Sequence, residues 1–87
     1  MHLKIMKFKE LHNVTGSRIK LLRKQKKITQ DQLAARLQTY GIQIDQKAIS
    51  RLESGQRVVT DYELVQIARI LNVSVDDLIQ DVVYDRT

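Results

Sequence analysis

The chain has 87 residues, no cysteine, no proline and three glycines, and its formal net charge is +5. A chain of this length builds one modest core and buries about two thirds of its unfolded surface. The lack of cysteine excludes disulfides, thiolate metal ligands and thiol nucleophiles. Because the protein then has no need of an oxidising compartment, we expect it to be located in the cytoplasm. No apolar run approaches the roughly 18 residues that span a bilayer, so we expect no membrane association.

Charge is unevenly divided along the chain. Residues 1–57 hold 13 Lys or Arg against 4 Asp or Glu, whereas residues 58–87 hold 2 against 6. The basic part favours an anionic partner, although solvated lysine-rich helix faces explain the charge equally well. Frequent Leu, Ala, Gln, Arg and Lys without proline are typical of packed short helices, so we expect an all-α fold.

Five helices are expected in residues 17–79, between an N-terminal arm (1–16) and a C-terminal tail (80–87). The first helix should span about Ser17 to Lys26. In a capping box, a hydroxyl side chain and the side chain three residues later each bond the other's backbone N–H. This pattern predicts the starts of the second, fourth and fifth helices, at Thr29 with Gln32, Thr60 with Glu63, and Ser74 with Asp77.

The third helix should begin after Asp45, a typical N-cap residue. Gly41 and Gly55 stand where the second and third helices should end, because glycine readily adopts positive φ. Apolar residues at helical spacing predict the buried sides of the first four helices: Ile19 and Leu22; Leu33, Ala34 and Leu37; Ala48, Ile49 and Leu52; Leu64, Ile67, Ala68 and Leu71. Val75, Leu78 and Ile79 should do the same in the fifth.

Three runs of sequence, 28–34 (ITQDQLA), 49–55 (ISRLESG) and 71–78 (LNVSVDDL), resemble the lambda-repressor-like helix-turn-helix family, also called the xenobiotic-response-element type. The similarity covers about residues 17–79. It implies a compact five-helix DNA-binding domain whose second and third helices form the helix-turn-helix. The connection before the third helix is about five residues longer than the family usually has. We expect Tyr40, Ile42 and Ile44 in this loop to pack on the core rather than contact DNA.

The resemblance places a recognition helix at 46–53, with base-reading side chains at Gln46, Lys47, Ser50 and Arg51. Residues at i, i+1, i+4 and i+5 of a helix project from one side and fit a major groove about 12 Å wide. Arg51 and Lys47 can bond guanine O6 and N7, and Gln46 can pair with adenine.

Phosphate contacts are expected from the start of the second helix and from the loop after the third: Thr29, Gln30, Gln56 and Arg57. The N-termini of the second and third helices should add backbone N–H donors. In the family, the residue matching Gln30 also braces the recognition helix. Arg23 and Glu53 match a structural ion pair between the first and third helices, the alternative being two exposed charges.

Other chemistries find no support. His2 and His12 have no cysteine or carboxylate cluster near them, so we expect no metal and no cofactor. Asp76 and Asp77 are explained as partners of a helix dipole. No set of nucleophile, base and orienting group can be assembled from the sequence, so we expect the protein to have no enzymatic activity.

The expected function is sequence-specific binding of double-stranded DNA by a transcriptional regulator, in most cases of this class a repressor that binds as a homodimer. Apolar residues in the tail and near the N-terminus favour either a dimer contact or packing on the protein's own core, and the tail 80–87 is a candidate dimer contact. The alternative function is a protein-interaction or antitoxin-like module. The acidic fourth and fifth helices would offer the surface for a protein partner.

Overall fold

The structure is a computed structural model that describes residues 4–7, 12–79 and 82–85. Within these residues, four α-helices are followed by the 3-10 turn η2, and two short strands flank them. Their bounds are β1 Lys4–Lys7, α1 Gly16–Gln25, α2 Gln30–Thr39, α3 Gln46–Glu53, α4 Asp61–Leu71, η2 Asp76–Leu78 and β2 Val82–Asp85. Within the described residues, no helix is long and apolar enough to cross a membrane.

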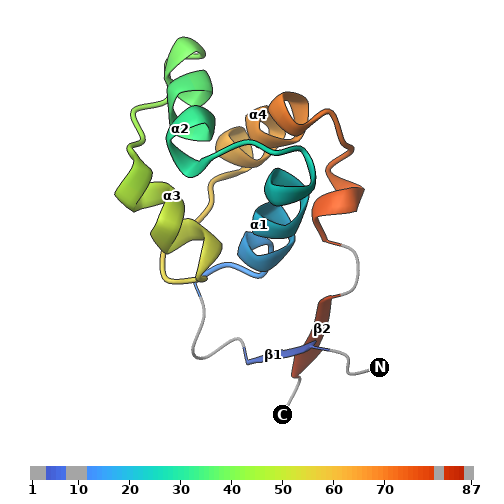
Figure 1. Ribbon diagram of the computed structural model, residues 1–87. Helices are drawn as coiled ribbons and strands as arrows, with labels where there is room; N and C mark the ends of the chain where they lie inside the picture. Colours follow the sequence, from blue (N-terminus) through green and yellow to red (C-terminus); the bar gives the residue numbers. More distant parts are fainter. Residues whose placement is uncertain (1–3, 8–11, 80–81, 86–87) are drawn as a thin grey trace.

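The helices share one core, to which α1, α2, α3, α4 and η2 all contribute (Figure 1). Its largest fully buried side chains are Ile19, Leu33, Leu37, Ile49, Leu52, Ile67, Leu71 and Leu78. All of them lie at positions expected to face inward. Gly16 lets the start of α1 approach the end of α3, because a Cβ at this position would collide with the backbone carbonyl of Leu52.

The predicted starts of α2, α3 and α4 are confirmed, as are the ends of α2 and α3 near Gly41 and Gly55. Both threonine capping boxes form, at Thr29 and Thr60, and Asp45 accepts a hydrogen bond from the backbone N–H of Ala48 at 2.8 Å. Gly41 and Gly55 have φ of 81° and 83°, which a glycine adopts without a steric cost. The local sequence therefore sets where α3 begins and ends.

A fifth α-helix is not confirmed. The Ser74–Asp77 capping pair forms, with the two backbone N–H groups bonded at 2.9 and 3.1 Å, but only the 3-10 turn η2 follows. Leu78 is fully buried, whereas Val75 and Ile79 stay exposed. Burial of one side chain does not offset the unfavourable free energy of forming the first turn of an α-helix, so the helix does not propagate.

The long connection between α2 and α3 packs against the core at two of its three apolar residues. Ile42 and Ile44 are buried, and the Gln38 side-chain amide donates to the Ile44 carbonyl at 2.8 Å. Tyr40 is 51% exposed, so the prediction that it packs on the core is wrong. The extra residues thus widen the core and hold α3 in place.

The two strands were not expected from the sequence. β1 and β2 pair in parallel, with Lys4 opposite Val82 and Lys7 opposite Asp85, and they lie below the helices in Figure 1. The pairing joins segments from opposite ends of the chain, which periodicity within either segment cannot reveal. The candidate dimer contact at 80–87 lies partly outside the described residues, and its described part is paired within the chain.

Candidate nucleic-acid interface

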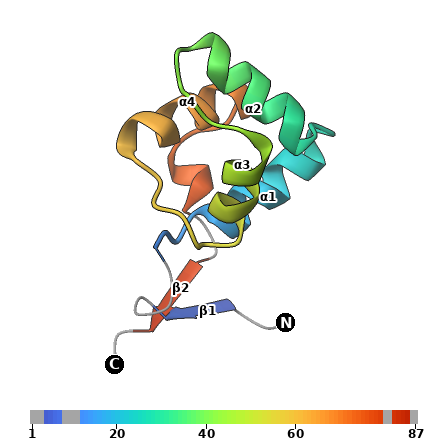
Figure 2. The ribbon, with the colours of Figure 1, turned by 90° about the vertical axis from the view of Figure 1, so that its left-hand side faces the viewer.

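The outer face of α3 carries the four side chains that the sequence analysis assigned to base reading. Gln46, Lys47, Ser50 and Arg51 are all exposed. On the opposite side of the helix Ile49, Leu52 and Glu53 are buried. Figure 2 looks onto α3 from its outer side, where nothing in the described part of the chain covers it. The burial of one face therefore fixes the direction in which the polar face points.

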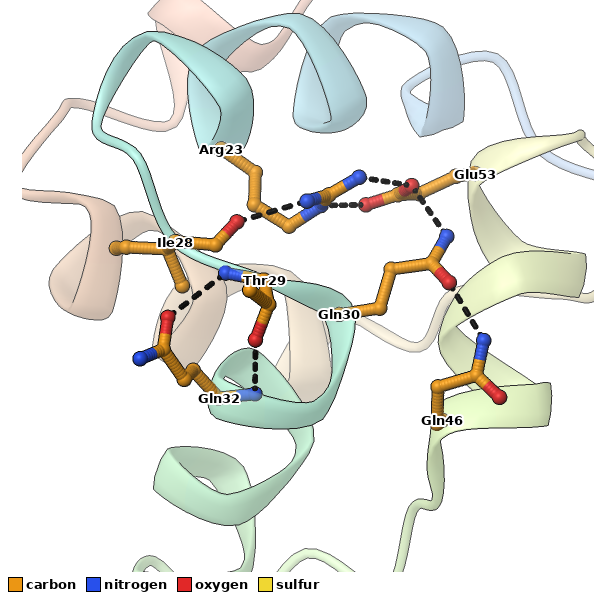
Figure 3. A network of polar contacts seen from close by, with 7 residues as sticks. All are labelled: Arg23, Ile28, Thr29, Gln30, Gln32, Gln46 and Glu53. Atoms are coloured by element: carbon orange, nitrogen blue, oxygen red, sulfur yellow. Dashed lines mark hydrogen bonds and ion pairs between the residues drawn. The ribbon is translucent and has the colours of Figure 1, made fainter.

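A chain of polar contacts ties this face to the core (Figure 3). Arg23 of α1 donates to both carboxylate oxygens of Glu53, from Nε at 2.6 Å and from Nη2 at 3.0 Å. Its Nη1 donates to the Ile28 carbonyl at 2.7 Å. Because both charged side chains are buried, this ion pair acts within the protein and does not compete for DNA.

Gln30 connects the buried ion pair to the exposed face. Its Nε2 donates to Glu53 Oε1 at 3.0 Å, and its Oε1 accepts from Gln46 Nε2 at 2.6 Å. The two contacts use the donor and the acceptor of Gln30 and so determine which way its amide faces. Gln46 keeps one N–H and its carbonyl oxygen for another partner, which is the pair of groups that adenine requires.

The expected phosphate-binding residues lie in different settings. Thr29 is exposed and its hydroxyl oxygen accepts from Gln32, but a hydroxyl that accepts one bond still has a proton to donate. At the N-terminus of α3 the Asp45 carboxylate already occupies an N–H group. At α2 the cap is the uncharged Thr29, and the one acidic residue of the first turn, Asp31, is not the cap. A phosphate can therefore approach the N-terminus of α2 without displacing a capping carboxylate.

The loop after α3 meets the exposed face of the helix. A depression of about 400 Å³ is lined by residues from α3 and from this loop: Asp45, Lys47, Ala48, Arg51, Gln56 and Arg57. Two predicted base readers, Lys47 and Arg51, therefore lie beside two predicted phosphate contacts, Gln56 and Arg57. The structure brings together residues from the start of α3 and from the loop beyond its end.

Arg57 is already engaged in an ion pair. Its Nη1 and Nη2 donate to the two carboxylate oxygens of Glu63, each at 2.9 Å, and Nη1 also donates to the Val58 carbonyl. The hydrogen bond from Arg57 lowers the pKa of Glu63 from its usual value, and the same bond raises the pKa of Arg57. Arg57 therefore anchors the loop to α4 and reaches a phosphate only by sharing its donors with Glu63.

Comparison with known proteins identifies the family. A profile described as Helix-turn-helix matches residues 19–78. The chain belongs to the helix-turn-helix family. The crystal structure of the restriction-modification controller protein C.AhdI from Aeromonas hydrophila superposes with a TM-score of 0.64 and 26% identity, covering 74% of this chain and 86% of that one. No curated protein sequence matches.

These findings confirm the resemblance to the xenobiotic-response-element type of helix-turn-helix protein. Such proteins bind DNA and regulate transcription, and this chain is one of them. Among the described residues, no group of three His, Cys, Asp or Glu side chains is placed to hold a metal ion.

One contact of this helix-turn-helix protein was missed by sequence reasoning. Asn13, assigned to the N-terminal arm, donates from Nδ2 to the carbonyls of Leu52 at 2.9 Å and Arg57 at 2.6 Å. Its Oδ1 accepts from the Gly16 N–H at 2.7 Å. An asparagine three residues before a helix start was the only available signal. Asn13 links the beginning of α1 to the end of α3 and to the loop that follows.

The Arg57–Glu63 pair makes stability depend on pH. Because the pKa of Glu63 is lowered in the folded state, the pair stabilises above the unfolded pKa of about 4.3 and is lost as pH falls through the folded pKa. We expect Glu63→Gln to lower the free energy of unfolding by about 1–2 kcal/mol near pH 7, since the pair is partly exposed. Urea denaturation at several pH values measures this difference.

Glutamine at position 63 still offers an oxygen to the Thr60 N–H, so the variant keeps the capping box while it removes the charge and the second acceptor for Arg57. The part of the difference that comes from the charge of Glu63 should shrink as pH falls through the lowered folded pKa of Glu63. The pKa of Asp77 is also lowered, by hydrogen bonds from Ser74. Asp77 is present in both proteins, so its contribution to the pH dependence cancels when their stabilities are subtracted. A difference that stays constant from neutral to acid pH would contradict the assigned role of the pair.

Proposed function

We propose that this protein is a sequence-specific transcriptional regulator that reads the major groove with Gln46–Glu53 and represses by occupying promoter DNA. The observation that carries the proposal is the outer face of α3, where Gln46, Lys47, Ser50 and Arg51 are exposed side by side. An α-helix fits the major groove, and these side chain types carry the donors and acceptors that distinguish base pairs there.

The bracing of the recognition helix supports direct readout. A side chain that must find one base edge loses less conformational entropy on binding when the protein already holds it in place. Gln46 is held by Gln30, and Gln30 is held by Glu53, which is itself buried. This arrangement favours a site built to discriminate sequences over a merely basic surface.

Contacts to the DNA backbone are proposed at both sides of α3. Thr29 and Gln30 stand at the start of α2, where the helix N-terminus favours an anion. Gln56 is exposed in the loop after α3, next to Arg57. Two flanking phosphate contacts would fix the register of α3 in the groove without adding sequence information.

The relative C.AhdI is named as a restriction-modification controller, which supports a regulatory role for this chain. From C.AhdI we transfer to this chain only the regulatory role, and not the kind of gene that is regulated. A homodimer is part of the proposal because two α3 helices about 34–36 Å apart would match successive turns of DNA. The protein would then recognise an inverted repeat.

The test is selection from a randomised duplex library at about 150 mM salt, followed by affinity measurements at several salt concentrations. We expect an enriched inverted repeat and an affinity that falls with salt. Transcription in vitro from a promoter that carries the repeat should then decrease as protein is added. If no sequence is enriched and no saturable binding occurs at micromolar protein, the alternative of a protein-interaction or antitoxin-like module replaces this proposal.

A further inference from the structure

Exposed apolar side chains gather where the loop after α3 enters α4. Val58, Tyr62 and Val65 are 57%, 58% and 39% exposed. Tyr62 and Val65 are three residues apart in α4 and therefore share one face of the helix. Leu64 and Ile67, in contrast, turn toward the core. The exposed face is more apolar than a helix surface in water requires.

Two opposite charges lie at the two ends of the same face. Asp61, in the first turn, and Arg69, in the last turn, stand four residues before and four after Val65, and both are exposed. Eight residues of helix separate them by about 12 Å, which is too far for an ion pair within the helix. Neither side chain has a hydrogen bond or ion pair with the described part of the chain.

We propose that α4 is the dimer contact and that a second copy of this chain packs antiparallel on the stripe Asp61, Tyr62, Val65 and Arg69. The inference rests on the homodimer of the proposed function and names its surface. A two-fold axis through Val65 brings Val65 against Val65 of the second copy. It also brings each Asp61 opposite Arg69 of the other copy.

Charge symmetry selects a second copy over an unrelated protein. In a two-fold interface the same patch meets itself, so a residue i that contacts j requires j to contact i. The stripe meets this condition, because its charges have opposite signs at equal distances from an apolar centre. A stripe with one sign of charge would repel its own copy.

The position of α4 is compatible with binding to DNA. In Figure 2, which looks onto the outer face of α3, α4 lies to one side of α3 rather than in front of it. A two-fold axis directed toward the viewer beside α4 would leave both copies of α3 facing the same way. One helix stripe and Val58 form a small interface, so we expect a weak dimer in the micromolar range that binding to DNA completes.

The experiment is sedimentation equilibrium of the full chain without DNA, over about 1–500 µM. Asp61→Arg and Arg69→Asp should each weaken dimerisation by about tenfold or more, because each sets like charges opposite one another. The decisive sample is an equal mixture of the two variants. In the mixed dimer, arginine at position 61 of one variant lies opposite aspartate at position 69 of the other, and the second pair, Arg69 with Asp61, is also of opposite charge. The mixture should therefore dimerise as the unchanged protein does.

A second pair of variants tests the apolar centre. Val65→Arg should weaken dimerisation by about tenfold or more, whereas Leu21→Arg should not, although Leu21 is also an exposed apolar residue of a helix. Circular dichroism checks that each variant is folded. Asp31→Arg, in the first turn of α2, controls for the loss of an acidic residue near a helix N-terminus.

Two results would overturn the inference. Dimerisation that survives Val65→Arg and both charge reversals would place the contact elsewhere, for example at β1 and β2. An unchanged protein that is monomeric throughout the concentration range would exclude α4 as a contact formed in solution. Failure to find a DNA site, with the α4 dimer intact, would remove the proposed function and leave this inference standing.

Discussion

Replacing Glu53 by alanine is expected to lower the free energy of unfolding by about 3–5 kcal/mol. The carboxylate of Glu53 accepts two hydrogen bonds from Arg23 and one from Gln30, and both members of the ion pair are buried. Alanine leaves the Arg23 guanidinium inside the protein, where the Ile28 carbonyl is its one other acceptor among the described residues. Urea denaturation followed by circular dichroism measures the loss.

Two further variants separate the buried charge from a general effect of removing an acid. Asp31→Ala, at an exposed position in α2, should cost less than about 1 kcal/mol. The double variant Arg23→Met with Glu53→Leu should recover part of the loss, because no uncompensated charge stays buried. A cost for Glu53→Ala as small as that for Asp31→Ala would show that the ion pair does not support the fold.

Replacing Arg51 by alanine is expected to weaken binding to the selected DNA site by about 1–3 kcal/mol, or roughly 5- to 150-fold in Kd. Arg51 is exposed on the outer face of α3 and its guanidinium can donate two parallel hydrogen bonds to guanine. The loss of affinity should be confined to one base position. The variant should therefore bind the selected site and sites altered at that position with the same affinity. Kd values for a set of single-base variants of the site measure this.

Lys24→Ala supplies the matched control. Lys24 is an exposed basic residue of α1, and its removal should have little effect or should weaken binding to all sequences alike. If Arg51→Ala weakened every site equally, Arg51 would contact phosphate and the readout assigned to it would be wrong. The folded state of Arg51→Ala should be unaffected, because no hydrogen bond within the described residues involves this side chain.

The local chemistry of the chain was sufficient to predict most of the helices. A capping box places donor and acceptor within three residues, so Thr29 and Thr60 signal their helices without reference to the rest of the fold. The same pattern at Ser74 produced only a 3-10 turn. A cap determines where a helix can begin, but burial of apolar side chains decides whether it continues.

The candidate site depends both on local sequence and on long-range packing. Helical spacing and the family resemblance together predict that Gln46 and Arg51 share one face of α3. They do not reveal that Gln46 is bonded to Gln30, because 16 residues separate the two. Arg57 was assigned to phosphate by its position in a loop, and its pairing with Glu63 forms only when the loop folds against α4.

The amino-acid sequence was sufficient to predict the helical class, the starts of α2, α3 and α4, the inward-facing residues and the polar face of the recognition helix, since each depends on contacts within a few residues. The packing of Ile42 and Ile44 and the Arg23–Glu53 ion pair were also expected, the pair from the family resemblance. Three features required the folded chain: the Asn13 clamp, the hydrogen bond from Gln46 to Gln30, and the pairing of β1 with β2. These contacts join residues far apart in the chain, and their partners are chosen by the packing of the whole core rather than by any local pattern.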